Sequence, residues 1–455
     1  MAIPARSRGR AAERARRSFS ARHLLLPVQK FVHMEVSSGT VLLAAAIVAL
    51  LWANSRWQGS YEALWNAELS LRIGGFSLAH SLRDWVNDAL MVVFFFIVGL
   101  EVKREFMYGE LSDWQRASLP VVAALGGMIV PALLYTAFNY GQPTARGWGI
   151  PMATDIAFAL GVLALLGERV PSSLRVFLLA LATVDDIGAI LVIALFYSER
   201  LIPVALVIAL LLIGAILIMQ RLGVRNLLYY VPVAVFFWFA VLESGVHATI
   251  AGVVLGFVTP TGAFLTKKAF SEIAPMLVRD AKNAIVNGDN DRSEAVLGQI
   301  EELTTGTEAP ADRLIRLIHP WSSFLVLPLF ALANAGVVLS GETLAQALTS
   351  PASRGIFIGL VAGKVFGIVL FAFIAVRLGL ARLVPGTAWL QLTGVGVLGG
   401  IGFTVSLFIT DLAFTDAGTI ARAKLGVLAA SLIAGFVGYL MLHLVPARPA
   451  PKTIS

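Results

Sequence analysis

The chain carries the run Leu179-Ala-Leu-Ala-Thr-Val-Asp-Asp-Ile-Gly-Ala-Ile-Leu-Val-Ile-Ala-Leu195, which sets two adjacent acids in a segment long and apolar enough to cross a membrane. One ionised carboxylate at the centre of a bilayer costs about 2.5–3.5 kcal/mol on insertion scales. Asp185 and Asp186 also repel each other when both are charged. A pair this unfavourable indicates function, and cation binding in exchange for proton binding is its simplest explanation.

The composition also indicates a membrane protein. Of the 455 residues, 58% are hydrophobic and 14% are charged, whereas soluble domains have about 45–50% apolar and about 25% charged residues. Repeated apolar stretches of about 20 residues predict one polytopic helix bundle. The absence of cysteine excludes disulfides and thiol chemistry. Nothing in the sequence predicts a cofactor.

The net charge of +7 does not predict a nucleic-acid-binding face, because its distribution follows the apolar runs. Arginines cluster in the Arg-rich N-terminal tail and in the segment 262–318. With a cytoplasmic N-terminus, most lysines and arginines fall on the cytoplasmic side, and the C-terminus is cytoplasmic too. An organellar targeting peptide is the alternative for the tail, but the first span is too long for a signal-peptide core.

The apolar runs divide the chain into five regions. We expect a basic cytoplasmic tail over 1–33, transmembrane helices one to eight over 34–261, a polar cytoplasmic loop over 262–318, transmembrane helices nine to twelve over 319–445, and a cytoplasmic tail over 446–455. About twelve spans are predicted, at 38–54, 84–100, 118–138, 149–167, 174–197, 202–219, 227–242, 245–259, 321–339, 355–376, 390–412 and 424–443. Alternation over 69–78 around a Gly-Gly pair predicts a short external hairpin.

Two spans are interrupted. The fourth contains Pro151, Thr154 and Asp155, and the eleventh has five glycines between Gly394 and Gly402. Each is the second span of a trio, which is typical of transporters built from inverted repeats with broken helices. Glycines that only permit close helix packing are the alternative, but the trios also hold the intramembrane charges.

The acids and one lysine of the two trios are the candidate ion-binding residues. Asp185 and Asp186 diverge by about 100° on a helix and do not chelate one ion as a simple pair. Lys364 is the one basic residue that the span map places well inside a span, so we expect it to pair with an intramembrane carboxylate. The alternative is a fixed ion pair without a transport role. Asp155 is predicted to offset helix N-termini at the break rather than to ligate the ion.

Other polar residues have weaker patterns. Thr154 and Thr183 offer oxygens suited to a hard cation, but each alternatively bonds back to its own helix. Asp88 is predicted to be an accessory intramembrane acid near the outer end of the second span. His247 and His319 titrate near neutral pH when unperturbed, although a lone histidine is usually a packed one. A last set, interpreted on sequence alone as a solvated helix end, comprises Glu101, Lys103, Arg104 and Glu105.

Several motifs closely resemble the bacterial NhaA sodium/proton antiporter family. They are Asp-Asp-Ile-Gly-Ala-Ile from 185, Ala-Thr-Asp-Ile-Ala-Phe-Ala-Leu-Gly from 153, Gly-Leu-Glu-Val-Lys-Arg-Glu from 99, Ser-Gly-Val-His-Ala-Thr from 244, His-Pro-Trp from 319, Phe-Ala-Leu-Ala-Asn-Ala-Gly from 330 and Gly-Gly-Ile-Gly-Phe-Thr-Val-Ser from 399. The resemblance runs from about residue 36 to about 445. It implies an all-α polytopic membrane protein of about twelve transmembrane helices, with inverted three-helix repeats and two broken helices crossing at mid-membrane.

The resemblance also implies roles for single residues. Asp185 and Asp186 match the sodium site, with Asp186 the direct ligand. Lys364 matches the lysine that pairs with the first aspartate, and Asp155 the acid at the helix crossing. The residues that match a pH-response group are Glu101, Arg104, Glu105 and His247. Where well-known members carry a Glu-His pair, this chain has Ile315 and Arg316, and its loop is longer, so the family's pH profile is not carried over.

We therefore interpret the chain as an electrogenic antiporter, not an enzyme, of the bacterial inner (plasma) membrane. It is expected to export Na⁺, and also Li⁺, in exchange for H⁺, to serve pH and sodium homeostasis, and to form a homodimer in the lipid bilayer. The alternatives are a K⁺/H⁺ antiporter of the same fold and a cation sensor that does not transport. An intramembrane aspartyl protease using Asp155 and Asp185 is disfavoured, because Asp185 lacks the Gly-x-Gly-Asp pattern.

Overall fold

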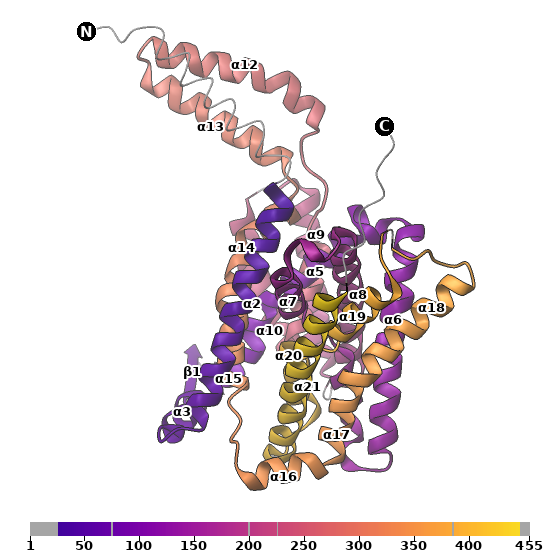
Figure 1. The fold of residues 1–455 in the computed structure, drawn as a ribbon. Helices are drawn as coiled ribbons and strands as arrows, with labels where there is room; N and C mark the ends of the chain where they lie inside the picture. Colours follow the sequence, from indigo (N-terminus) through magenta and orange to yellow (C-terminus); the bar gives the residue numbers. More distant parts are fainter. Residues whose placement is uncertain (1–25, 74–75, 199–200, 225, 385, 446–455) are drawn as a thin grey trace.

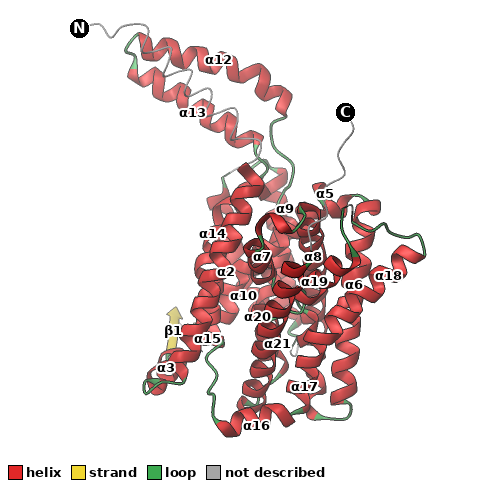
Figure 2. Cartoon of the chain, in the orientation of Figure 1, coloured by secondary structure: helices red, strands yellow, loops and turns green. Residues whose placement is uncertain are grey.

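The computed structural model describes residues 26–73, 76–198, 201–224, 226–384 and 386–445. Across these ranges the chain is helical apart from one hairpin (Figures 1 and 2). The hairpin pairs β1 (Glu68–Ile73) with β2 (Phe76–Ser81) in antiparallel register. The prediction of a single short hairpin is confirmed, while its Gly-Gly turn lies outside the described residues.

Helices long and apolar enough to span a membrane account for most of the bundle. Among the described residues seven are continuous and three more are bent pairs, which gives up to ten spans. Two shorter apolar helices, Leu227–Leu242 and Ala248–Val258, lie at the other two of the twelve predicted positions. The prediction of an all-α polytopic membrane protein is confirmed. The first six spans are built from α2 (Leu26–Ala53) with α3 (Gln58–Trp65), α4 (Leu82–Trp85) with η1 (Val86–Leu90) and α5 (Met91–Tyr108), α6 (Trp114–Asn139), η3 (Pro143–Met152) with α7 (Ile156–Leu165), α8 (Ser172–Phe196) and α9 (Pro203–Arg221).

The last six spans, like the first six, include one that is interrupted near its middle. It is built from η5 (Leu227–Tyr229) with α10 (Tyr230–Leu242), α11 (Ala248–Val258), α14 (Pro310–Trp321) with η6 (Ser322–Val326) and α15 (Leu327–Asn334), α17 (Pro351–Ile358) with η7 (Gly359–Gly363) and α18 (Lys364–Arg377), α19 (Trp389–Leu398) with α20 (Phe403–Ala413), and α21 (Ala417–Leu444). Short connecting helices are η2 (Glu110–Ser112), η4 (Gly167–Arg169) and α16 (Gly341–Thr349).

The two predicted interruptions are real breaks. The helix axes of η3 and α7 differ by 43°, and those of α19 and α20 by 46°. Each broken pair is the middle member of a trio: α6, η3–α7 and α8 in one, and α17–α18, α19–α20 and α21 in the other. The trios pack on each other through α6 and α18. Gly126 and Gly367 make this close approach possible, because a Cβ on either would overlap a backbone carbonyl of the other helix.

The segment expected to be a polar loop contains helices. α12 (Lys267–Val286) and α13 (Asn290–Thr307) form an antiparallel helical hairpin that projects from one end of the bundle (Figure 1). Side-chain caps begin both helices, since Thr266 and Asp289 each accept a hydrogen bond from the backbone three residues later. The bundle resumes earlier than expected, because α14 begins at Pro310.

Candidate functional site

The two helix breaks meet, and Asp155 lies where they meet. Its Oδ1 accepts a hydrogen bond of 2.9 Å from the backbone N–H of Phe158, which caps the N-terminus of α7. Its Oδ2 accepts from the backbone N–H and the hydroxyl of Thr404, at 3.1 and 2.7 Å, in the first turn of α20. One buried carboxylate therefore caps two helix N-termini, whose partial positive charge it offsets. This geometry agrees with the electrostatic role expected for Asp155.

Asp185 lies beside this crossing and is fully buried in α8. Its Oδ2 accepts a hydrogen bond from the ammonium of Lys364, with which it forms an ion pair, and lies 2.7 Å from the hydroxyl of Thr154. Its Oδ1 is buried and has no hydrogen-bond partner within the described ranges. A buried carboxylate oxygen without a donor is unfavourable, which makes it a candidate cation ligand.

Lys364 reaches Asp185 from the second trio. It is fully buried at the start of α18, directly after the π-helical turn η7. Such π-turns are frequent at functional sites because they rotate the following side chains. The predicted pairing of Lys364 with an intramembrane carboxylate is thus found in the structure, and the partner is Asp185.

Asp186 is buried on the same helix, where it is rotated by about 100° from Asp185. Among described residues no hydrogen bond or ion pair holds its carboxylate. Three other carboxylates act on it electrostatically, those of Asp185, Glu101 and Asp155, against the single ammonium of Lys364. The surroundings of Asp186 are therefore net negative, which favours a bound cation or proton.

The two threonines differ. The Thr154 hydroxyl lies within hydrogen-bonding distance of Asp185 Oδ2 and, at 2.8 Å, of the Gly399 carbonyl, so it joins α8 to the break between α19 and α20. The Thr183 hydroxyl donates at 2.8 Å to the Leu179 carbonyl of its own helix. Thr183 is thus engaged in the local bonding that is the default for threonine in helices. Only Thr154 belongs to the site.

The charged cluster in the second half of α5 acts on the ion site through Glu101, whose carboxylate repels that of Asp186. Glu101 Oε1 is 3.6 Å from Nε2 of His319, which lies in α14. Arg104 is half-buried on the following turn, and Glu105 accepts a 3.0 Å hydrogen bond from the backbone N–H of Glu110. The cluster is therefore partly a helix end, as the sequence suggests, and partly a contact between two helices.

His247 is not part of this cluster. It precedes α11, which runs parallel to α5 with Gly252 beside Phe96 and Gly256 beside Gly99. That register sets His247 near the opposite end of α5 from Glu101. Its ring packs edge-on against Phe408, at 5.4 Å between centroids. The structure thus separates the predicted pH-response residues into two places.

Asp88 lies in the π-helical turn η1, near the start of the same span. Its backbone carbonyl accepts a 3.0 Å hydrogen bond from the indole N–H of Trp238 in α10. This contact joins two spans through the backbone of Asp88, and the role of its side chain as an accessory acid stays a prediction.

The span map was wrong about a second lysine. Lys424, expected at the outer edge of the last span, is 6% exposed within α21. Its ammonium lies 2.8 Å from Oδ1 of Asp411 in α20. Signals for the Lys424–Asp411 pair were present in the sequence, because Asp411 falls inside the eleventh predicted span and Lys424 borders the twelfth. The sequence interpretation also missed Thr404.

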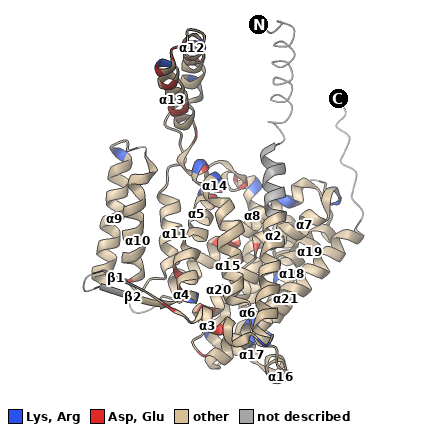
Figure 3. Cartoon of the chain, turned by 90° about the vertical axis from the view of Figure 1, so that its left-hand side faces the viewer, with Lys and Arg blue, Asp and Glu red and all other residues tan. Residues whose placement is uncertain are grey.

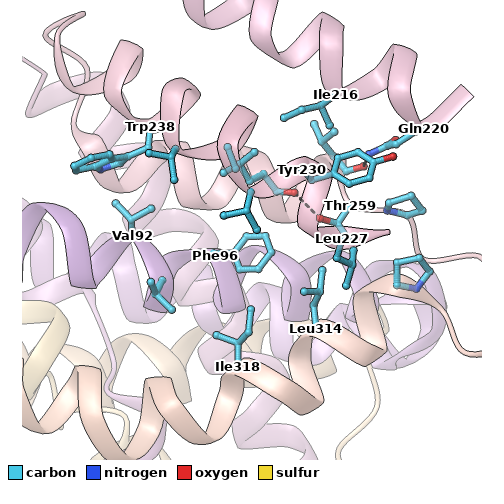
Figure 4. Close-up of a pocket in the computed structure, with 18 of the residues that line it drawn as sticks. Val92, Phe96, Ile216, Gln220, Leu227, Tyr230, Trp238, Thr259, Leu314 and Ile318 are labelled. Atoms are coloured by element: carbon cyan, nitrogen blue, oxygen red, sulfur yellow. Dashed lines mark hydrogen bonds between the residues drawn. The ribbon is translucent and has the colours of Figure 1, made fainter. Parts of the chain in front are cut away.

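A cavity of about 500 Å³ lies elsewhere, between α5, α9, α10, α11 and α14 (Figure 4). Its walls are mostly aliphatic and aromatic, as at Val92, Phe96 and Trp238. A monovalent cation entering it would lose water without gaining oxygen ligands. None of the candidate ion-binding residues lines it.

Comparison with known proteins gives a consistent result. The sequence model described as Na⁺/H⁺ antiporter 1 matches residues 29–442. A protein of Oleidesulfovibrio alaskensis named Na(+)/H(+) antiporter NhaA is 45% identical over 94% of this chain and 96% of its own length. Proteins of the same name from Rhodopirellula baltica and Acidithiobacillus ferrooxidans are 47% and 48% identical, covering 91% and 93% of this chain and 93% and 99% of their own lengths.

Proposed function

Because this chain belongs to the Na⁺/H⁺ antiporter family and exchanges Na⁺ for H⁺, we propose that the exchange takes place at Asp185 and Asp186. The observation that carries this proposal is the buried Oδ1 of Asp185, which has no hydrogen-bond partner among the described residues. The buried Asp186 side chain is its neighbour on α8.

Oxygen atoms around these acids suit a hard monovalent cation. Asp186 provides a carboxylate, Asp185 its free oxygen, and Thr154 a hydroxyl that is already directed at the site. In this proposal Asp186 is the direct ligand and Asp155 is not, because the helix N-termini occupy both Asp155 oxygens. Asp155 instead makes the polar crossing tolerable inside the membrane.

Protons and the cation compete for the same groups. In the proton-loaded form, Asp186 carries one proton and the Asp185–Lys364 pair shares another as an ammonium. When sodium binds, Asp186 releases its proton. The cation also attracts the Asp185 carboxylate and so weakens its ion pair with the Lys364 ammonium. The ammonium then releases the second proton. Two protons thus leave for one sodium ion.

This balance makes the exchange electrogenic. Moving one net charge across a membrane is worth about 2.3 kcal/mol per 100 mV. An inside-negative potential therefore draws protons inward and drives sodium out against its gradient. Such an antiporter would lower cytoplasmic sodium and acidify an alkaline cytoplasm, which is the homeostatic role we propose.

The protein is a multi-pass membrane protein, and we propose that it lies in the bacterial inner membrane with both termini cytoplasmic. Lys and Arg gather mostly at the end of the bundle that carries α12 and α13 (Figure 3). Positive charge marks the cytoplasmic side. The proposed cytoplasmic location of the segment 262–318 rests on the same argument. That the protein forms a homodimer stays a prediction.

Ion selectivity measured against pH tests this function. In proteoliposomes of the purified protein, we expect Na⁺ and Li⁺ to drive proton movement, and K⁺ to drive little, because the site offers few oxygen ligands. Equal exchange with K⁺ would favour the potassium antiporter. Sodium binding without any ion flux would favour the sensor.

A further inference from the structure

A second lysine–aspartate pair, with a buried lysine and a partly buried aspartate, lies outside the ion site. Lys424 of α21 and Asp411 of α20 are 2.8 Å apart, with side chains 7% and 17% exposed. Both residues belong to the second trio. Removing two charges from water requires compensation, and nothing in the proposed exchange uses this pair.

The pair is connected to helices outside the trios. The Lys424 ammonium is 3.4 Å from Oδ1 of Asn334, at the end of α15. The Asn334 amide donates at 2.8 Å to Oδ1 of Asn87 in η1. We call these four residues, Asp411, Lys424, Asn334 and Asn87, the latch network, because they join the second trio to two neighbouring spans.

The latch network lies at the end of the bundle opposite to the Glu101–His319 contact. Asn87 is about 20 Å from Glu101 along one span, and Asn334 is about 20 Å from His319 along another, at 1.5 Å per residue. Asp411 is about 10 Å beyond Thr404 along α20. The ion site therefore lies between the two, and the latch network lies on the outer side.

An aromatic cluster separates the latch network from the ion site. Phe408, one turn before Asp411 on α20, contacts Phe95 of α5 at 5.5 Å and Phe330 of α15 at 6.2 Å between ring centroids. All three are buried. The interface between the second trio and its neighbours is thus apolar next to the site and polar at its outer end.

We propose that Lys424 and Asp411 are positioning residues that, through Asn334 and Asn87, hold the outer side of the ion path closed, and that this connection must separate for the site to reach the outside. The proposal rests on the proposed exchange at Asp185 and Asp186. The Lys424–Asp411 pair stays within the trio, while the Lys424–Asn334 and Asn334–Asn87 contacts are available to break. Polar contacts suit this task because water replaces them when they open.

The test compares the two faces of the membrane. Asn334→Leu removes the link and leaves the lysine–aspartate pair intact. The double variant Asp411→Asn with Lys424→Met removes both charges together, so that neither is left buried alone. Asp416→Asn is the matched control, because Asp416 is an exposed carboxylate at the same end that caps α21. Right-side-out and everted vesicles from a host without its own sodium antiporters give the KM for sodium at each face.

We expect both latch variants to lower the outer KM at least about 5-fold and to change the inner KM by less than about 2-fold, since apparent affinity scales with the population of the competent state. The control should change neither. Equal changes at both faces, no change, or loss of folded protein in both variants would overturn the proposal. If the unaltered protein itself shows no sodium-driven proton movement, the proposed exchange fails instead.

Discussion

Asp186→Asn is expected to abolish sodium-driven proton movement while leaving the protein folded. The substitution keeps the size of the side chain and removes the charge, and no hydrogen bond or ion pair among the described residues depends on that carboxylate. We expect the exchange rate in proteoliposomes to fall at least about 100-fold, which corresponds to about 2.7 kcal/mol. A folded protein without exchange would separate the role of Asp186 from a role in stability.

Thr183→Val is the matched control for Asp186→Asn. It changes a buried polar side chain one turn earlier on α8, whose hydroxyl is engaged with its own helix. We expect it to keep exchange within about 3-fold of the unaltered protein, since threonine back-bonding contributes little to a helix. Full exchange by Asp186→Asn, or equal loss in both variants, would contradict the assignment of the site.

Lys364→Met is expected to destabilise the protein more than it weakens sodium binding. The substitution leaves the fully buried Asp185 carboxylate without its ammonium partner. Breaking a buried pair by removing one partner typically costs about 3–5 kcal/mol. Thermal unfolding in detergent should show a clear decrease in melting temperature. Sodium affinity should change by less than about 10-fold, because the bound sodium ion itself compensates the charge of the unpaired Asp185 carboxylate.

The double variant Asp185→Asn with Lys364→Met is the control for charge stranding. It removes both members of the pair, and we expect it to recover most of the lost melting temperature. It should exchange one proton per sodium ion and no longer be electrogenic, since Asp186 still carries a proton while the second proton has no carrier. A single variant Lys364→Met as stable as the unaltered protein would show that the Asp185–Lys364 pair is not the contact that the structure describes.

The central residues of the ion site could be predicted from the sequence, because a charged residue inside a long apolar run is itself a sign of function. Asp155, Asp185 and Lys364 stand out in apolar runs, and each has a partner in the structure. Their exact connections were not predictable. Thr404 reaches Asp155 only because two breaks far apart in the sequence meet, and no local pattern marks that contact.

The ends of the spans were harder to predict than their centres. Lys424 follows a helical turn containing Arg422, and an apolar-run map therefore ends the span there. Whether such a lysine reaches lipid headgroups or turns inward depends on Asp411, which belongs to another helix. The hairpin of α12 and α13 was missed for a related reason, since polar amphipathic helices outside the bundle give no apolar run.

Proton release on sodium binding tests the competition at Asp185 and Asp186 most directly. Sodium chloride is added to the purified, weakly buffered protein, with choline chloride as the control for ionic strength, and released protons are counted against bound sodium. We predict close to two protons per sodium ion in the unaltered protein and no sodium-dependent release in Asp186→Asn. Sodium binding without proton release, or equal release in the variant, would contradict the account.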